Sequence, residues 1–172
     1  MDFKGVSAIL NKYGEQIANA IQLKLKQDDT DASGRTYASV DYKVTKETQL
    51  EVYYSGVVNV LDEGLPPNKV YPTINSIVRW MDAKGIQPRN LKTGRFVKKT
   101  RAYKRRTAFA IRSAIVNKGT IKRFGYKGTG VLKFAFSNDR LQKMGDELSS
   151  AFGNEINDQI LLNFKSNGFT IE

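Results

Sequence analysis

The sequence contains no cysteine and no histidine among its 172 residues. Their absence excludes disulfide frameworks, thiol nucleophiles, zinc sites built on Cys or His, and Ser-His or Cys-His catalytic relays. No stretch is apolar enough to span a bilayer, and the N-terminus has no apolar signal-peptide core. We therefore expect a soluble protein that is made and retained in a cytoplasm, folded as a single domain, residues 1–172.

Acidic residues are missing from one long stretch of the chain, residues 83–138. This stretch holds 16 Lys or Arg and no Asp or Glu, whereas the remainder holds 12 basic and 17 acidic residues. The net charge of +11 is therefore concentrated in the middle of the sequence. Segregation of this size creates a field of one sign on part of the fold, and such a field attracts polyanions. We expect an anionic partner, with nucleic acid as the first candidate.

The first third of the chain predicts a helix followed by a β-hairpin. Residues 3–27 carry apolar side chains at helical spacing, which is typical of one amphipathic helix. Polar turn residues around Gly34 follow this helix. Apolar and polar residues then alternate at 40–44 and again at 50–54, which predicts two half-buried strands. Residues 56–61 either continue the sheet or start a short helix.

The rest of the chain predicts three helical segments separated by basic loops. A helix is expected at about 74–84, with a glycine stop. Two turn signals in a polar stretch predict an exposed basic loop at about 86–100. Helical spacing returns at 101–117, and a long final helix begins at 138. The elements predict an α+β fold, in which a small antiparallel sheet is packed by an N-terminal helix, a central basic helix and a long C-terminal helix.

Three arginines of the central basic helix are spaced so that they share one face of it. At about 100° per residue, Arg101, Arg105 and Arg112 fall within roughly 40° of one another. We therefore expect the core on one side of this helix and the cations on a separate face. The surface expected to meet the anionic partner comprises basic residues of the helix and its flanking loops: Arg95, Lys98, Lys99, Arg101, Lys104, Arg105, Arg106, Arg112, Lys122 and Arg123.

No recognition helix, zinc finger or other sequence-reading module accompanies these cations in the sequence. Contacts to nucleic acid are therefore expected at phosphates, without sequence choice and with strong salt dependence. Two other interpretations of the cations stay open. They can form a solvated face, or they can pair with the acidic flanks of the same chain or of a neighbouring one.

Signals for an enzyme are weak. Asp41-Tyr42-Lys43 matches the acid-x-Lys fragment of many metal-dependent nucleases, with Glu15 or Glu51 as a further ligand for Mg²⁺. An alternating strand produces the same triplet by chance, and nuclease chemistry needs a fuller site. We therefore expect no catalysis, no metal site and no cofactor, and a Mg²⁺-dependent nuclease is only a remote alternative.

Several short motifs occur in a familiar order along residues 4–165, between an N-terminal and a C-terminal amphipathic helix. They are Ala32-Ser33-Gly34-Arg35, Ser39-Val40, Val60-Leu61-Asp62-Glu63-Gly64, Ile77, Trp80-Met81, Lys84-Gly85-Ile86, Ala110-Ile111-Arg112-Ser113-Ala114-Ile115 and Lys118-Gly119-Thr120. Their order resembles that of the neck and tail-completion proteins of tailed bacteriophages. The chain differs from the family pattern at Glu63, where members often have an aromatic residue, and in a longer loop at 86–100.

The resemblance implies a structural virion protein with an α+β fold and no catalysis. Such a protein forms a homo-oligomeric ring in the head–tail connector, contacts the portal and other neck or tail proteins, and lets the double-stranded DNA genome pass. It is made in the host cytoplasm and resides in the virion. A sequence-independent nucleic-acid-binding protein is the alternative, since the basic stretch suits a lumen around DNA and a DNA-binding surface equally well.

Overall fold

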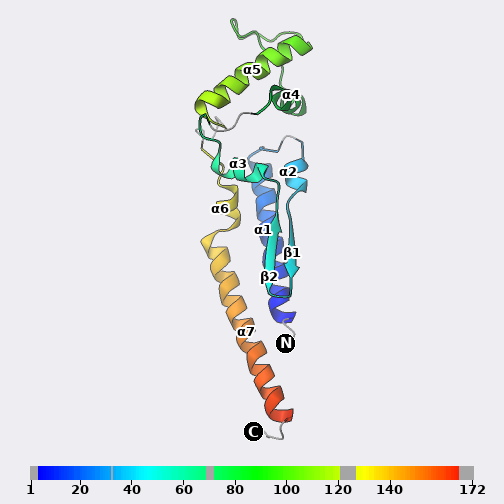
Figure 1. Cartoon of the computed structure of the whole chain (residues 1–172), viewed down its shortest axis with the longest axis vertical. Helices are drawn as coiled ribbons and strands as arrows, with labels where there is room; N and C mark the ends of the chain where they lie inside the picture. Colours follow the sequence, from blue (N-terminus) through cyan, green and yellow to red (C-terminus); the bar gives the residue numbers. More distant parts are fainter. Residues whose placement is uncertain (1–3, 32, 69–71, 121–126, 167–172) are drawn as a thin grey trace. The chain divides into compact units, whose positions relative to one another are not determined.

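The computed structural model describes residues 4–31, 33–68, 72–120 and 127–166, without the side chains of residues 161–166. It combines helices with one two-stranded antiparallel sheet, which confirms the α+β class. None of the helices within these ranges is both long and apolar enough to cross a membrane. In chain order the elements are α1 (Lys4–Gln27), α2 (Arg35–Ala38), β1 (Asp41–Thr45), β2 (Gln49–Tyr53), α3 (Val57–Glu63), α4 (Ile74–Ala83), α5 (Arg101–Lys118), α6 (Val131–Ala135) and α7 (Asn138–Ser166) (Figure 1).

The chain divides into two compact units, each assembled from separate segments. The first unit comprises Met1–Leu23, Ser39–Tyr54 and Lys133–Glu172, and the second comprises Lys24–Ala38 and Ser55–Leu132. Because the chain passes between the units four times, neither is a continuous stretch of sequence, and the single domain stays a prediction. The sheet and α7 belong to the first unit, whereas the central basic helix, α5, belongs to the second.

α1 buries one face along most of its length. Its buried large side chains recur at steps of three or four residues, which is the spacing of one helix face. They are Val6, Leu10, Tyr13, Ile17, Ile21 and Leu25. The predicted amphipathic helix is therefore confirmed, with its first residue at Lys4.

The hairpin packs closely on α1 at Gly14. β1 and β2 pair antiparallel, with Tyr42 opposite Val52, as the alternation of the sequence predicts. The side chains of Tyr42 and Leu50 lie so close to Gly14 that a Cβ atom placed there would come within 2.8 Å of the Cδ1 atom of Leu50 and closer still to the Tyr42 ring. Only glycine fits this contact without a shift of the hairpin, because real Cβ atoms do not approach carbon atoms so closely.

α7 runs antiparallel to α1 in the first unit, and polar contacts join them. The Glu155 carboxylate accepts hydrogen bonds from the backbone N–H groups of Gly5, at 2.9 Å, and Val6, at 3.4 Å. About two helical turns further along, Glu147 accepts from Lys12 Nζ at 2.7 Å and from the Tyr13 hydroxyl at 3.0 Å. The contacts advance along α1 while they retreat along α7, so the two helices point in opposite directions (Figure 1).

The second unit is organised around the packing of α4 on α5. Ile77 and Met81 of α4 and Ala108 of α5 are buried together, with Ile74, Val78, Ile86, Ile111 and Ile115 packed around them. Each helix begins with a threonine cap, because the Thr73 hydroxyl accepts from Ser76 N–H and the Thr100 hydroxyl accepts from Tyr103 N–H. Both helices lie where the sequence predicts them.

The C-terminal end of α3 is held by residues before and at the start of α6. Residues 57–61, which the sequence leaves open between strand and helix, form α3. The Asp62 carboxylate accepts from Leu132 N–H at 2.6 Å, and Leu61 O accepts from Thr129 N–H at 2.8 Å. Gly128 lies directly against the backbone of Asp62, where no Cβ atom could fit. Gly128 therefore has a packing role; residues 121–126 lie outside the described residues.

Replacing Gly14 by alanine tests the contact between α1 and the hairpin. In a helix interior, alanine is more favourable than glycine by about 1 kcal/mol of stability. Overpacking, in contrast, typically lowers stability by about 1–3 kcal/mol. We expect Gly14→Ala to lower the free energy of unfolding in urea, in spite of the gain in propensity. Gly153→Ala on α7, where nothing lies within 4 Å of the added atom, is the matched control and should be stabilising. Equal stabilisation by both substitutions would contradict the close approach.

Acid titration tests the contact between α1 and α7. Hydrogen bonds from Lys12 and then from Tyr13 hold the pKa of Glu147 below the ordinary value of a glutamate. A carboxyl whose pKa is lower in the folded than in the unfolded state contributes stability at neutral pH and loses it as the pH falls through the folded pKa. We expect Glu147→Gln to flatten the acid side of the stability profile relative to the parent chain. Coinciding profiles for Glu147→Gln and the parent chain would show that this contact adds nothing.

Candidate anion-binding surface

The described members of the predicted anion-binding surface all lie in the second unit. Arg95, Lys98 and Lys99 belong to the segment before α5, and the helix carries the others. The members on α5 are Arg101, Lys104, Arg105, Arg106 and Arg112. Lys122 and Arg123 lie outside the described residues.

The segment before α5 forms an ordered turn. Asn90 N–H donates to Arg95 O at 2.8 Å, and the Asn90 side-chain oxygen accepts from Lys92 N–H at 2.9 Å. The guanidinium of Arg89 stacks on the Phe96 ring, 4.3 Å from its centre. Residues 91–96 and 98–100 are exposed, so the turn presents its cations to solvent.

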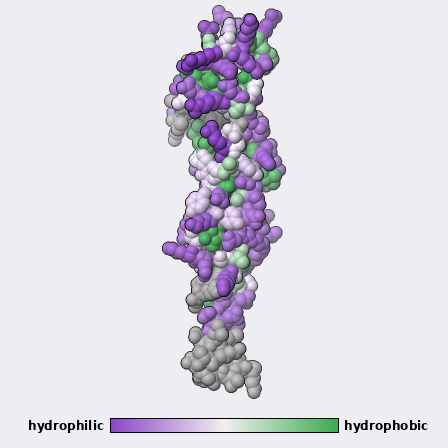
Figure 2. Space-filling model, turned by 90° about the vertical axis from the view of Figure 1, so that its right-hand side faces the viewer, coloured by the Kyte–Doolittle hydropathy of each residue, from purple (hydrophilic) through white to green (hydrophobic). Residues whose placement is uncertain are grey.

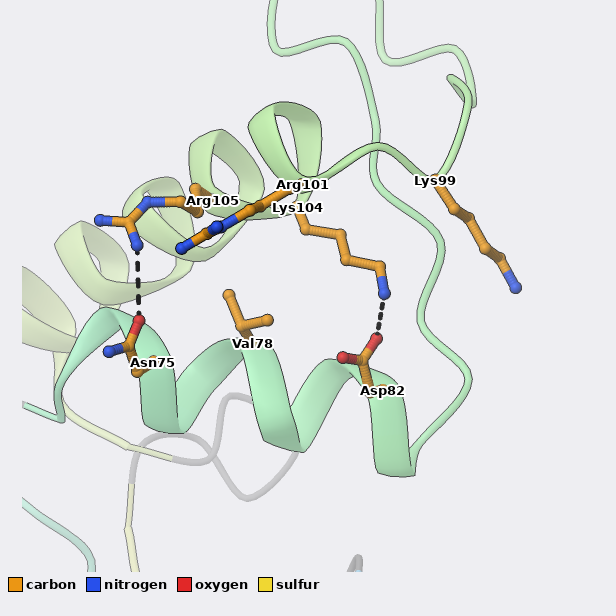
Figure 3. A pocket seen from close by; sticks show the side chains of 7 residues that line it. All are labelled: Asn75, Val78, Asp82, Lys99, Arg101, Lys104 and Arg105. Carbon is orange, nitrogen blue, oxygen red and sulfur yellow. Dashed lines mark hydrogen bonds and ion pairs between the residues drawn. The ribbon is translucent and has the colours of Figure 1, made fainter.

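A shallow pocket of about 270 Å³ lies where the N-terminal half of α5 faces α4 (Figure 3). Figure 3 shows Arg101 and Arg105 extending in the same direction above Asn75 and Val78, whereas Lys99 points away. Arg105 Nη1 donates to the Asn75 side-chain oxygen at 3.5 Å. The pocket thus brings together four of the predicted residues with three residues of α4, and its lining is Asn75, Val78, Asp82, Lys99, Arg101, Lys104 and Arg105.

The charges of the pocket are only partly compensated. Lys104 Nζ pairs with Asp82 at 2.6 Å. Among the residues that the structure describes, no carboxylate pairs with Lys99, Arg101 or Arg105. The first turn of α5 contains no acidic residue, so the positive end of the helix dipole adds to the same field. This part of the molecule, at the top of Figure 2, is mostly hydrophilic on the face shown.

The core face of α5 differs from the prediction. Ala108 is fully buried, and by helical geometry it lies within about 60° of Arg101, Arg105 and Arg112. Ala114, which the periodicity places with the core, is exposed. Ile111 and Ile115 of the predicted core face do pack on α4. The buried face extends further toward the arginines than predicted, so that the arginines border the seam between α5 and α4. The sequence could not show this, because the choice of face depends on where α4 packs.

Two polar pocket residues were not predicted, Asn75 and Asp82. Both belong to α4, and no pattern within either helix links them to the arginines of α5. The only signal in the sequence is the position of Asp82, which is the last acidic residue before the basic stretch. Their place in the site depends on the packing of the two helices.

The nuclease triplet lies on the hairpin. Asp41 and Lys43 are exposed on β1, and Lys43 is opposite Glu51 of β2. Glu51 accepts a hydrogen bond from the Tyr53 hydroxyl, and Glu15 is exposed on α1. Within the described ranges, no three carboxylates lie close enough to hold a metal ion. A Mg²⁺-dependent nuclease stays a remote hypothesis.

Comparison with known proteins identifies no relative of this chain. No protein-family model matches it, and neither the curated proteins nor the solved structures give a significant match. Its function has to be inferred from its own residues and from the motif order described above.

Two matched alanines test which face of α5 packs on α4. Ala108→Leu places a large side chain against Ile77 and Met81, and overpacking of this kind typically costs about 1–3 kcal/mol. Ala114→Leu makes the same change at an exposed position of the same helix and should alter stability by about 0.5 kcal/mol or less. Urea unfolding measures both. A larger loss for Ala114→Leu would restore the face predicted from the periodicity.

Proposed function

We propose that this chain is a structural virion protein of a tailed bacteriophage, part of the head–tail connector through which the genome passes. The observation that carries the proposal is the positive charge of α5 and of the turn before it, where no carboxylate pairs with Lys99, Arg101 or Arg105 among the described residues. A ring around passing DNA needs attraction to phosphates without sequence choice. The motif order supplies the setting of a neck or tail-completion ring.

The segments that carry the resemblance have structural roles in this fold, which supports a protein without catalysis. Asp62 holds the backbone at the start of α6, and Gly64 ends α3 with a φ of 75°. Gly119 ends α5 with a φ of 84°, and Thr120 N–H donates to Leu65 O at 3.0 Å. The motifs therefore build the frame of the second unit.

In this role the chain forms a homo-oligomeric ring and contacts the portal and other neck or tail proteins. The cations meet double-stranded DNA at its phosphates, or they meet acidic residues of a neighbouring subunit. The protein resides at the head–tail interface of the virion.

A sequence-independent nucleic-acid-binding protein is the second candidate function. The observation that favours it is the pocket between α4 and α5, in which Arg101 and Arg105 extend side by side with no carboxylate paired to either among the described residues. Such a protein needs no ring and no virion.

Native mass spectrometry and negative-stain imaging distinguish the two functions. We expect the purified chain, or particles that contain it, to show a closed ring. The sample is first treated with nuclease, so that bound DNA cannot join copies together. A stable monomer that shifts DNA at low salt and never enters a particle would overturn the connector proposal.

A further inference from the structure

The pocket between α4 and α5 has the charge and the size for one small anion. Its volume of about 270 Å³ lies just below the usual range of small-molecule pockets, which suits a single group better than a whole nucleotide. We propose that it binds one phosphate of a nucleic-acid backbone, held by Arg101 and Arg105. This inference deepens the proposed function and rests on its claim that the cations meet DNA.

Arg101 and Arg105 are the binding groups. Guanidinium groups present several N–H donors in a plane, which matches the oxygens of a phosphate better than an ammonium group does. One donor of Arg105 is directed to Asn75, which positions the guanidinium above α4 and leaves its other donors for the ligand. Arg101 extends in the same direction, so the two groups reach the same space (Figure 3).

Lys104 and Asp82 form an ion pair that lowers the net positive charge of the pocket. Because Lys104 is paired with Asp82, it contributes little net charge to the pocket. The carboxylate of Asp82 also repels an anion placed beside it. The site therefore binds phosphate more weakly than its four cations alone would allow, and removal of Asp82 should strengthen it.

The surroundings of the pocket favour a ligand with repeated charges. Lys98 and Lys99 lie on the exposed segment that leads into α5, and Arg95 lies on the turn before them. Lys99 points away from the pocket and can meet a second phosphate (Figure 3). The N-terminus of α5 adds its dipole next to these side chains. A nucleic-acid backbone offers phosphates to all of them, whereas a free phosphate fills the pocket alone.

Fluorescence anisotropy of a labelled DNA duplex, measured over a series of salt concentrations, tests the site. We expect Arg101→Gln and Arg105→Gln each to weaken binding about tenfold at low salt. The double variant should reduce the slope of log affinity against log salt by about 1, because one phosphate contact is lost. Lys118→Gln removes the same charge from the other end of α5, about 20 Å from Arg105, and should change affinity by less than about twofold.

Asp82→Asn gives a test of opposite sign. This substitution removes the carboxylate and releases Lys104, so we expect tighter binding of the same duplex by several-fold. The pair that it breaks is partly exposed, with side-chain exposures of 25% and 51%, and exposed pairs contribute little to stability. Circular dichroism and urea unfolding of every variant confirm that the changes in affinity do not arise from unfolding.

A measurement on the unaltered chain needs no variant. Titration with inorganic phosphate, against chloride at equal ionic strength, should shift the NMR signals of the Arg101 and Arg105 Nε–H groups before those of other arginines. Uniform shifts of all arginines, or equal losses of DNA affinity in Lys118→Gln and Arg105→Gln, would show diffuse attraction and overturn the site. Binding of polyglutamate but not of DNA through the same arginines would also overturn it, in favour of an acidic protein partner.

The failure of this inference is distinguishable from the failure of the proposed function. If DNA binding depends on the pocket but the chain forms no ring, the phosphate site is supported and the connector proposal is wrong. If the chain forms a ring whose affinity for DNA does not change when Arg101 and Arg105 are replaced, the connector proposal is supported and the phosphate site is wrong.

Discussion

The packing of Ala108 against Ile77 and Met81 is the contact on which the candidate site depends. A residue as small as alanine lets α5 lie close on α4, and it brings the arginines on either side of it to the edge of the seam. The core and the positive charge therefore share one side of the helix. Arg105 can reach Asn75, and Lys104 can reach Asp82, only because this apolar contact fixes the rotation of α5.

The first unit is stabilised by a different combination of contacts. The hairpin approaches α1 where glycine removes the side chain, and α7 contacts the same helix through the carboxylates of Glu147 and Glu155. The buried face of α1 supplies the hydrophobic contribution. The Glu155 carboxylate accepts from backbone N–H groups that a helix start leaves unpaired, and Glu147 accepts from the side chains of Lys12 and Tyr13. A chain without cysteine thus joins segments that are distant in sequence by packing and by charged hydrogen bonds.

Local signals in the sequence were sufficient for most of the fold. The threonine caps and glycine stops mark α4 and α5, and the alternation of residues 40–54 marks the hairpin. The sequence did not predict α2, and it left the segment that forms α3 open between strand and helix. It also did not predict the role of Gly128, because the backbone against which Gly128 packs belongs to Asp62, which is distant in the chain. For the site, the basic residues were visible as charge, but their pocket was not. The pocket needs Asn75 and Asp82 from another helix, and it lies beside the buried Ala108, which the periodicity of α5 did not place in the core.

The cap on the start of α1 has a consequence for the order in which the protein folds. The carboxylate that receives the N–H groups of Gly5 and Val6 belongs to Glu155, up to 150 residues later in the chain. During translation α1 leaves the ribosome well before this partner. The first unit therefore cannot close until α7 has also been synthesised, and contacts of such long sequence separation slow folding. Until then the apolar face of α1 stays without α7, so the nascent chain is open to chaperones.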